Sequence, residues 1–199
     1  LHVIPAYDGK PYYKDSYGEY WRSYKFITDA TSYDVVEKPE HFYQSAVAFG
    51  NFQCMLADYP ADTLNETIVG FHDTRARFEV FKKAVEEDVL GRAASVKDEI
   101  QFVLDREEVA NYFSELQDKG ELPLRVTHND TKLNNIMIDN KTGKGICVID
   151  LDTVMPGLAM NDFGDSIRFG ASTAAEDERD LSKVTCDMEL YELYTKGFI

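Results

Sequence analysis

The sequence predicts a mostly helical α+β protein with two small β-hairpins. Three observations support this class: a stretch rich in aromatic residues opens the chain, apolar side chains recur at helical spacing after residue 39, and two short apolar runs flank a polar turn near residue 140. The 199 residues, of which 44% are hydrophobic, are enough to bury one sizeable core.

The first element is a β-hairpin. Its two strands, Pro11–Lys14 and Tyr20–Ile27, are rich in Tyr, Trp and Phe, which favour strands. Between them lies the polar sequence Asp15–Gly18, which ends in Gly and predicts a turn.

Three helices follow the hairpin, and each has an apolar stripe that we interpret as core. The first begins at Pro39, because proline suits the first helical position. The third runs from about Val96 to Lys119 and ends at Gly120. The residues expected to face inward are Phe42, Ala46, Phe49 and Leu56 in the first helix, Phe78, Phe81, Val85 and Val89 in the second, and Val109, Phe113 and Leu116 in the third.

A strand-rich segment comes next. Leu124–Val126 predicts one short strand, and Ile136–Ile138 and Ile146–Ile149 predict a hairpin around the turn Asp139–Gly145. Two further helices are expected, one starting near residue 162 and one running from residue 186 to the end. The polar residues beside these strands are where we expect the chemistry.

Composition limits the possible partners. Lys and Arg number 21 against 36 Asp and Glu, and the resulting net charge of −15 argues against nucleic acid and anionic membranes as partners. The cysteines, Cys54, Cys147 and Cys186, are scattered, so we expect neither a disulfide framework nor a zinc site, and a cytoplasmic location fits best. No apolar run reaches membrane-spanning length.

The motif with the clearest chemistry runs from His128 to Asn135 and fits the pattern H-x-D-x-K-x-x-N, and Asp150 follows at the end of an apolar strand. Transfer of a γ-phosphoryl group needs a carboxylate to orient or deprotonate the acceptor hydroxyl, oxygen ligands for Mg²⁺, and a cation near the transferring group. Asp130 would be the base, Asn135 and Asp150 the metal ligands on either side of one hairpin, and Lys132 the cation.

Each of these residues also has an ordinary structural interpretation. His128 suits a packed side chain that braces the loop, Asp130 and Asn135 suit turns, and Asp150 suits a strand end. The joint match of spacing and strand context favours the catalytic interpretation over four separate structural ones.

A second motif, Asp162-Phe163-Gly164, has the letters of the metal-binding D-F-G of protein kinases. It lies too far along the chain from the expected base for the hairpin to return it, so Asp150 fills that role better. We expect Asp162 to begin a helix and to accept backbone N–H bonds, with the catalytic loop as one source. Asp165 and Arg168 have the spacing of a helical i, i+3 pair, and a substrate contact by Arg168 stays open.

A third motif, Val148–Val154, also suits the nucleophile motif of haloacid-dehalogenase-type phosphatases. That fold needs its nucleophile on an early strand of a parallel α/β sheet, whereas this motif comes late and follows helices, so we rank this alternative lower. Asp152, two residues beyond Asp150 on the same strand face, can support or join the metal site.

Three short segments, His128–Asn135, Ile149–Asp152 and Asp162–Asp165, resemble the aminoglycoside phosphotransferase/choline kinase superfamily. This resemblance implies a protein-kinase-like C-terminal lobe with a small β-hairpin at the catalytic loop, and it covers nearly the whole chain. Longer strings resemble the N-acetylhexosamine 1-kinase group: Glu19–Arg22, Val36–Glu40, Phe49–Phe52, Tyr59–Leu64 and Thr127–Asn135.

The resemblance implies an enzyme of carbohydrate metabolism that uses ATP and Mg²⁺ to phosphorylate the anomeric hydroxyl of an N-acetylhexosamine. It implies that Asp130 is the base, that Asn135 and Asp150 hold the metal, and that the backbone of the hinge residues Phe26, Ile27 and Thr28 meets adenine. A choline- or aminoglycoside-type acceptor stays open. The intact base and metal ligands argue against a non-catalytic kinase-like module.

By the same resemblance, residues 1–29 are the last hairpin of an N-terminal lobe with the hinge, and residues 30–199 are a catalytic lobe that is incomplete at its C-terminus. The Gly-rich loop and the Lys–Glu pair that hold ATP have no match in the sequence. We therefore expect a piece of a longer enzyme that folds, binds ATP weakly and turns over negligibly by itself. The oligomeric state is open.

Overall fold

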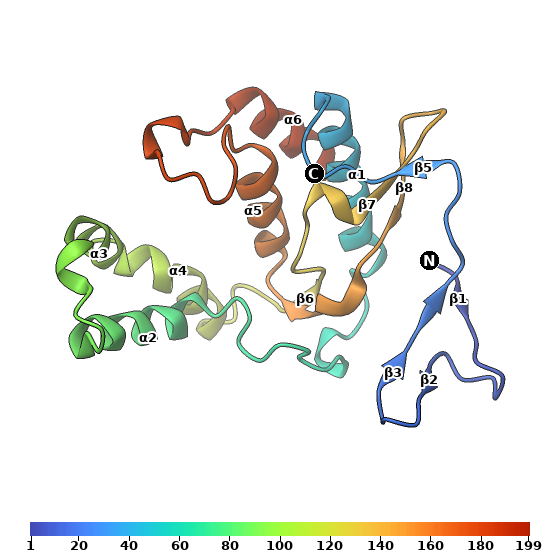
Figure 1. Cartoon of the computed structure of the whole chain (residues 1–199), viewed down its shortest axis with the longest axis horizontal. Coiled ribbons are helices and arrows are strands. Elements are labelled where there is room, and N and C mark those ends of the chain that lie inside the picture. The colour runs from blue at the N-terminus through green and yellow to red at the C-terminus, as the bar shows by residue number, and fades with distance from the viewer.

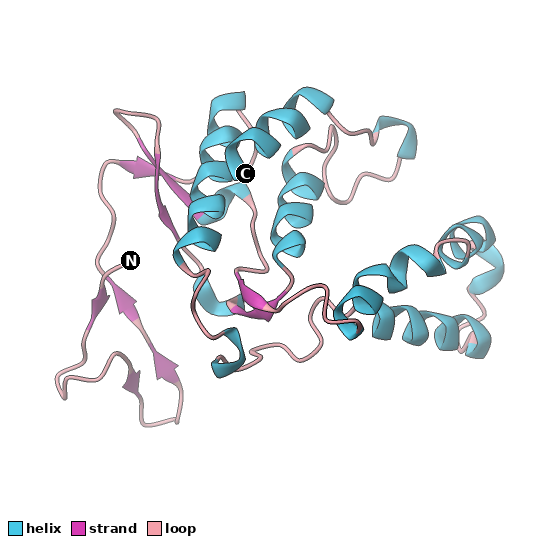
Figure 2. Ribbon diagram, turned by 180° about the vertical axis from the view of Figure 1, so that it is seen from behind, coloured by secondary structure: helices cyan, strands magenta, loops and turns pink.

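The computed structural model describes residues 1–199 and shows a helical core flanked by two smaller parts (Figure 1). Short N-terminal strands lie on one side of the core, and a group of three helices lies on the other, as the view from behind also shows (Figure 2). The expected mostly helical α+β class is confirmed. No helix combines the length and the apolar character needed to cross a membrane.

The N-terminal part is built from two antiparallel strand pairs. Strand β2 (Tyr13–Lys14) pairs with β3 (Tyr20–Trp21), which confirms the predicted hairpin, and β1 (Val3–Ile4) pairs with β4 (Ser23–Tyr24). The carboxylate of Asp15 holds the turn, since its Oδ1 accepts N–H bonds from the backbone of residues 17 and 19 at 2.9 Å each.

The core is organised around helix α1 (Pro39–Met55), which packs against α5 (Ala159–Gly170) and α6 (Met188–Phe198). Of its four predicted inward residues, Phe42, Ala46 and Phe49 are buried, whereas Leu56 lies just beyond the helix and is half-buried. Helices α1 and α6 approach very closely: a Cβ atom added to Gly197 would lie only 2.8 Å from the Cβ atom of Ala46. Larger residues at this crossing would therefore push the two helices apart.

Two small sheets cover the other side of α1. Strand β5 (Ala30–Thr31) pairs with β7 (Ile136–Asp139), which pairs with β8 (Gly145–Val148) in the predicted hairpin. Strand β6 (Arg125–Thr127) pairs with β9 (Met155–Gly157). Short 3-10 helices complete the chain: η1 (Ala61–Thr63), η2 (Ala93–Ser95), η3 (Leu133–Asn135), η4 (Leu151–Thr153) and η5 (Leu181–Lys183).

The third part, which we call the helical group, contains α2 (Thr74–Glu87), α3 (Lys97–Leu104) and α4 (Glu107–Asp118). The single helix predicted from Val96 to Lys119 is wrong, because the chain breaks at residues 105–106. Arg106 accounts for the break: its guanidinium stacks 3.4 Å from the ring centroid of Phe102 and donates to the Phe102 carbonyl at 2.7 Å. These contacts satisfy the end of α3 and turn the chain.

The helical group also buries less than its apolar stripes predict. Phe78 is buried, but Val89, Val109 and Phe113 are exposed. Val89 lies beyond α2, because Asp88 has a left-handed backbone with φ of 33° and ends the helix. The group packs mainly on itself, through α2 and α4, and touches the core at one end. Each of these two helices therefore buries only a narrow stripe of its surface.

Candidate active site

The predicted catalytic loop, residues 128–135, connects β6 to β7 at the centre of the molecule. His128 is fully buried within it and packs edge-on against Phe49 and Phe52, with ring centroids 5.3 and 5.8 Å away. Its Nε2 lies 3.0 Å from the carbonyl oxygen of Ile149. The histidine therefore ties the loop to the end of β8, which is the bracing position expected from the sequence.

Asp130 is half-buried, and two predicted partners lie beside it. The side-chain amide of Asn135 donates to the Asp130 carboxylate at 3.1 Å and to the Asp130 carbonyl at 2.8 Å. The ammonium of Lys132 lies 3.6 Å from Asp130 Oδ1. The structure thus brings Asp130, Lys132 and Asn135 together, as the spacing predicts.

Asp150 follows β8 and is brought to Asn135 by the hairpin. The backbone N–H of Ile149 donates to the carbonyl oxygen of Asn135 at 2.9 Å, next to the paired residues Ile136 and Val148. Asp150 itself has a left-handed backbone with φ of 56°. Such a conformation costs a non-glycine residue on the order of 1 kcal/mol and is concentrated at functional sites.

The next question is whether these residues fit a magnesium ion. Because the amide nitrogen of Asn135 faces Asp130, its amide oxygen is the atom left to serve as a ligand, with the carboxylate of Asp150 as the second. No group of three or more His, Cys, Asp or Glu side chains is arranged around a common centre. Mg²⁺ in phosphotransfer sites is held by one or two protein oxygen ligands together with substrate phosphates and water, so the donor chemistry of Asn135 and Asp150 fits.

Asp152, the further metal residue predicted from the sequence, has another partner in the structure. Its exposed carboxylate forms an ion pair with Arg22 at 2.5 Å. Asp150, Asp152 and Arg22 line a small pocket of about 430 Å³ between the N-terminal strands and the core, together with Tyr20, Tyr24 and Leu151. This contact ties the N-terminal strands to the segment after β8.

The hinge residues Phe26, Ile27 and Thr28 lie between β4 and β5, where the chain passes from the N-terminal strands to the core (Figure 1). Phe26 is exposed, and the carbonyl of Asp29 accepts the backbone N–H of Asn140 at 2.9 Å. Their roles as a hinge and as the contact with adenine stay predictions.

The side chain of Asp162, on helix α5, is hydrogen-bonded to the backbone of the catalytic loop. Its carboxylate accepts the backbone N–H groups of His128 at 2.9 Å and Asn129 at 2.8 Å, and the side-chain amide of Gln53 at 2.5 Å. The expected bond from the catalytic loop is therefore present, although α5 begins three residues earlier than predicted. Burial raises the pKa of Asp162, and the hydrogen bonds from His128, Asn129 and Gln53 oppose that shift.

Asp165 and Arg168 form the i, i+3 pair predicted from their spacing, with 2.8 Å between Arg168 Nη2 and Asp165 Oδ1. The other oxygen of Asp165 accepts the backbone N–H of Thr131 at 3.0 Å, so the pair is linked to the catalytic loop. Arg168 also pairs with Glu176 and lowers the pKa of that carboxyl. No sequence pattern indicated a role for Glu176, because this residue lies in an irregular segment.

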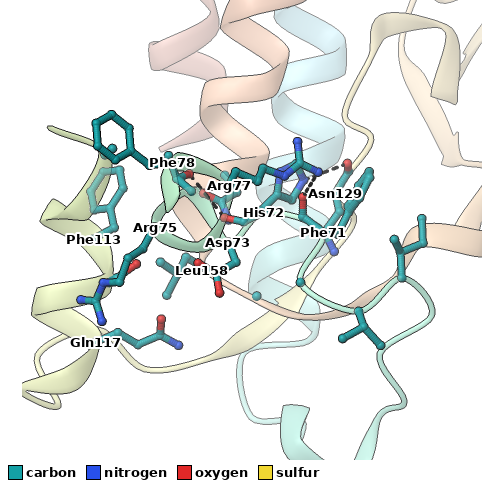
Figure 3. Close-up of a pocket in the computed structure, with 18 of the residues that line it drawn as sticks. Phe71, His72, Asp73, Arg75, Arg77, Phe78, Phe113, Gln117, Asn129 and Leu158 are labelled. Carbon is teal, nitrogen blue, oxygen red and sulfur yellow. Dashed lines mark hydrogen bonds between the residues drawn. The ribbon is translucent and has the colours of Figure 1, made fainter. Parts of the chain in front are cut away.

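A cavity of about 960 Å³ lies between the helical group and the core, and no sequence pattern predicted it. Figure 3 shows Phe78 and Phe113 on the side of the helical group, with His72 and Asn129 on the side of the core. The Nε2 atom of His72 lies 3.3 Å from the carbonyl oxygen of Asn129. The cavity therefore reaches the residue that precedes Asp130.

A solved structure with this architecture is the AMP-bound complex of spectinomycin phosphotransferase, APH(9)-Ia, with a TM-score of 0.56 and 14% sequence identity. The match covers 100% of this chain and 60% of that chain, so the chain spans about 60% of the length of that enzyme. The two proteins share a fold. The sequence also matches the phosphotransferase enzyme family over residues 10–184, which include the catalytic loop, Asp150 and α5. The chain therefore belongs to the phosphotransferase enzyme family.

Proposed function

We propose that this chain is the catalytic part of a kinase that moves the γ-phosphoryl group of ATP to the anomeric hydroxyl of an N-acetylhexosamine. The observation that carries the proposal is the joining of Asp130, Lys132 and Asn135 by contacts of 2.8 to 3.6 Å. Across the β7–β8 hairpin, Ile149, the residue before Asp150, bonds to the carbonyl of Asn135. The sugar acceptor rests on the sequence strings that resemble N-acetylhexosamine 1-kinases.

In the proposed reaction, Asp130 accepts a hydrogen bond from the anomeric hydroxyl and receives its proton as the oxygen bonds to the γ-phosphorus. The bond between that phosphorus and the β,γ-bridging oxygen breaks, and the electron pair leaves with ADP. Lys132 has its ammonium beside Asp130, where it stabilises the charge on the moving phosphoryl group.

The amide of Asn135 has a second task in this scheme. By donating to both the carboxylate and the carbonyl of Asp130, it fixes the direction of the base. When bound by Asn135 and Asp150, Mg²⁺ would neutralise phosphate charge.

The cavity beside the helical group supports an acceptor of sugar type. Its walls combine aromatic rings, among them Phe71, Phe78 and Phe113, with polar groups at His72 and Asn129. Aromatic faces with a few polar groups are a common way to hold a small polar ring and fix its orientation. We infer that the acceptor reaches Asp130 by passing Asn129.

The deciding experiment is a phosphate-transfer assay on the full-length natural protein and its Asp130→Asn variant, with ATP and Mg²⁺. The acceptor panel contains N-acetylglucosamine, N-acetylgalactosamine, choline, homoserine and aminoglycosides. We expect transfer to the two N-acetylhexosamines and a loss of at least about 100-fold in the variant, since general-base catalysis contributes that much.

The other outcomes each point to a different function. Transfer to choline or an aminoglycoside alone would replace the sugar assignment and keep the kinase. Transfer that survives Asp130→Asn would show another base. Nucleotide binding without transfer to any acceptor would favour a non-catalytic module, and ATP-independent hydrolysis of a phosphate ester would favour a phosphatase.

A further inference from the structure

Thr131, the residue after the proposed base, is held on three sides by helix α5. Its backbone N–H donates to the carboxylate of Asp165 at 3.0 Å, and its hydroxyl donates to the carbonyl of Asp162 at 2.5 Å. Its own carbonyl accepts the hydroxyl of Ser166 at 2.7 Å. Two consecutive peptide planes of the catalytic loop are thus anchored to one helix.

The hydrogen bonds continue from α5 to the C-terminal helix. The hydroxyl of Tyr194 on α6 donates to Ser166 Oγ at 2.6 Å, and Tyr194, Ser166 and Thr131 are all buried from solvent. A chain of two hydroxyl groups therefore joins α6 to the carbonyl of Thr131.

The donor and acceptor in each of these two hydrogen bonds follow from the number of hydroxyl protons available. The carbonyl of Thr131 can only accept, so the single hydroxyl proton of Ser166 points to it. Ser166 Oγ is then the acceptor for Tyr194, which must keep its proton. Burial raises the pKa of Tyr194 above its usual value of 10.0, so the phenol is a donor at neutral pH.

The carbonyl of Thr131 belongs to the peptide group that leads to Lys132. Fixing this peptide sets the start of the Lys132 side chain, whose ammonium lies 3.6 Å from Asp130. The preceding peptide is fixed by Asn135 at the Asp130 carbonyl and by Asp165 at the Thr131 N–H. The base and the cation are therefore aimed by bonds on both sides of Thr131.

We propose that Tyr194 and Ser166 are positioning residues for phosphate transfer, which hold Asp130 and Lys132 in register through the carbonyl of Thr131. This inference rests on the proposed kinase function. It assigns a task to two buried hydroxyl groups, Ser166 and Tyr194, whose residues line neither of the two cavities described.

The test compares Tyr194→Phe, Ser166→Ala and the double variant with wild type in the full-length natural protein. Tyr194→Phe keeps the ring that packs 4.6 Å from Phe42, so only the hydroxyl is lost. Tyr191→Phe on the same helix is the matched control, since no hydrogen bond of its hydroxyl is seen. We expect kcat to fall about three- to tenfold in each single variant, as the loss of one buried hydrogen bond implies, with the KM values for nucleotide and acceptor unchanged.

The double variant supplies the sharper measurement. Because the two hydroxyls act in series, adding Tyr194→Phe to Ser166→Ala should lower kcat no further. A second readout, hydrogen exchange on the 199-residue chain, should show faster exchange at the amide of Thr131 in Tyr194→Phe but not in Tyr191→Phe.

Unchanged kcat in both single variants, additive losses, or a rise in KM alone would overturn the positioning role. Should Tyr194→Phe fail to fold, Ser166→Ala carries the same kinetic test. Asp130→Asn separates the two hypotheses: if that variant stays active, the assignment of Asp130 as the base in the proposed function fails, whereas an inactive Asp130→Asn beside a fully active Tyr194→Phe removes only the present inference.

Discussion

Gly170 of helix α5 lies directly against the ring of Phe42 of helix α1, so that a Cβ atom at residue 170 would overlap the ring and lie 2.8 Å from its Cδ2 atom. Both residues are buried where α1, α5 and α6 meet. Gly164 is in the same helix, but a Cβ atom there would meet nothing within 4 Å. The two glycines provide a matched pair for testing this packing.

We predict opposite effects of alanine at these two positions. Gly170→Ala should lower the free energy of unfolding by about 1–3 kcal/mol, because an overpacked core must shift. Gly164→Ala should raise it by about 0.5–1 kcal/mol, because alanine favours an open helical position. Urea unfolding of both variants measures the difference. Equal effects of the two substitutions would contradict the packing of α5 on α1.

Neighbouring asparagines offer a second matched pair, at the proposed metal site. Asn135→Ala should lower phosphate transfer at least about tenfold and raise the Mg²⁺ concentration needed for half-maximal rate, since it removes a ligand and the bond that directs Asp130. Asn134→Ala should stay near wild type, because the Asn134 amide reaches only Asp34 at the surface. A magnesium titration of the rate checks both. A wild-type magnesium response in Asn135→Ala would exclude residue 135 as a ligand.

The buried carboxylate of Asp162 should be needed for folding. In Asp162→Asn, an amide NH₂ must face one of the N–H groups that the carboxylate now accepts, so a buried donor loses its partner. We expect a loss of about 1–3 kcal/mol in the free energy of unfolding. Asp152→Asn, which breaks only the exposed pair with Arg22, should change it by less than about 1 kcal/mol. Chemical denaturation of the two variants gives the comparison.

The pKa of Glu176 should lie below its usual value of 4.5, chiefly because the side chain accepts a hydrogen bond from Arg168. A lowered pKa in the folded state means that this pair stabilises the fold above pH 4.5 and that the contribution is lost as the pH falls through the lowered value. Arg168→Gln should return the pKa of Glu176 toward 4.5. Lys132→Gln should move it less, because Lys132 acts only through its more distant charge.

An NMR titration of the Glu176 carboxyl carbon measures these shifts in the 199-residue chain. Since the pair is exposed, added salt should weaken the effect. A pKa at or above 4.5 in the wild-type chain would show that the contact with Arg168 is absent in solution.

Local signals predicted much of this fold. Pro39 and the stripe of Phe42, Ala46 and Phe49 predicted α1, and the polar turn at residues 139–145 predicted the β7–β8 hairpin. The break between α3 and α4 was missed, because it depends on Arg106 folding back over Phe102 rather than on a glycine or proline. Periodicity alone carries no information on such a contact.

In the candidate site too, local contacts were predicted from the sequence and most contacts between distant residues were not. The spacing from His128 to Asn135 was sufficient to place Asp130, Lys132 and Asn135 together, since they belong to one short loop. The contacts of Ser166 and Tyr194 with that loop join residues distant in the chain, and nothing in their local sequence indicates a partner. Asp162 was predicted as an acceptor of backbone N–H groups from the catalytic loop, and His128 and Asn129 are the donors.

The beginning and the end of the helical group along the chain lie close together in space. Arg75, at the start of α2, forms an ion pair of 2.8 Å with Asp118, at the end of α4. The segment between them makes up one wall of the large cavity, whereas Asp130, Asn135 and Asp150 all lie outside it. The two splice points of an exchange of this segment would therefore lie close in space. Under the proposed function, such an exchange would change the acceptor and leave Asp130, Asn135 and Asp150 in place.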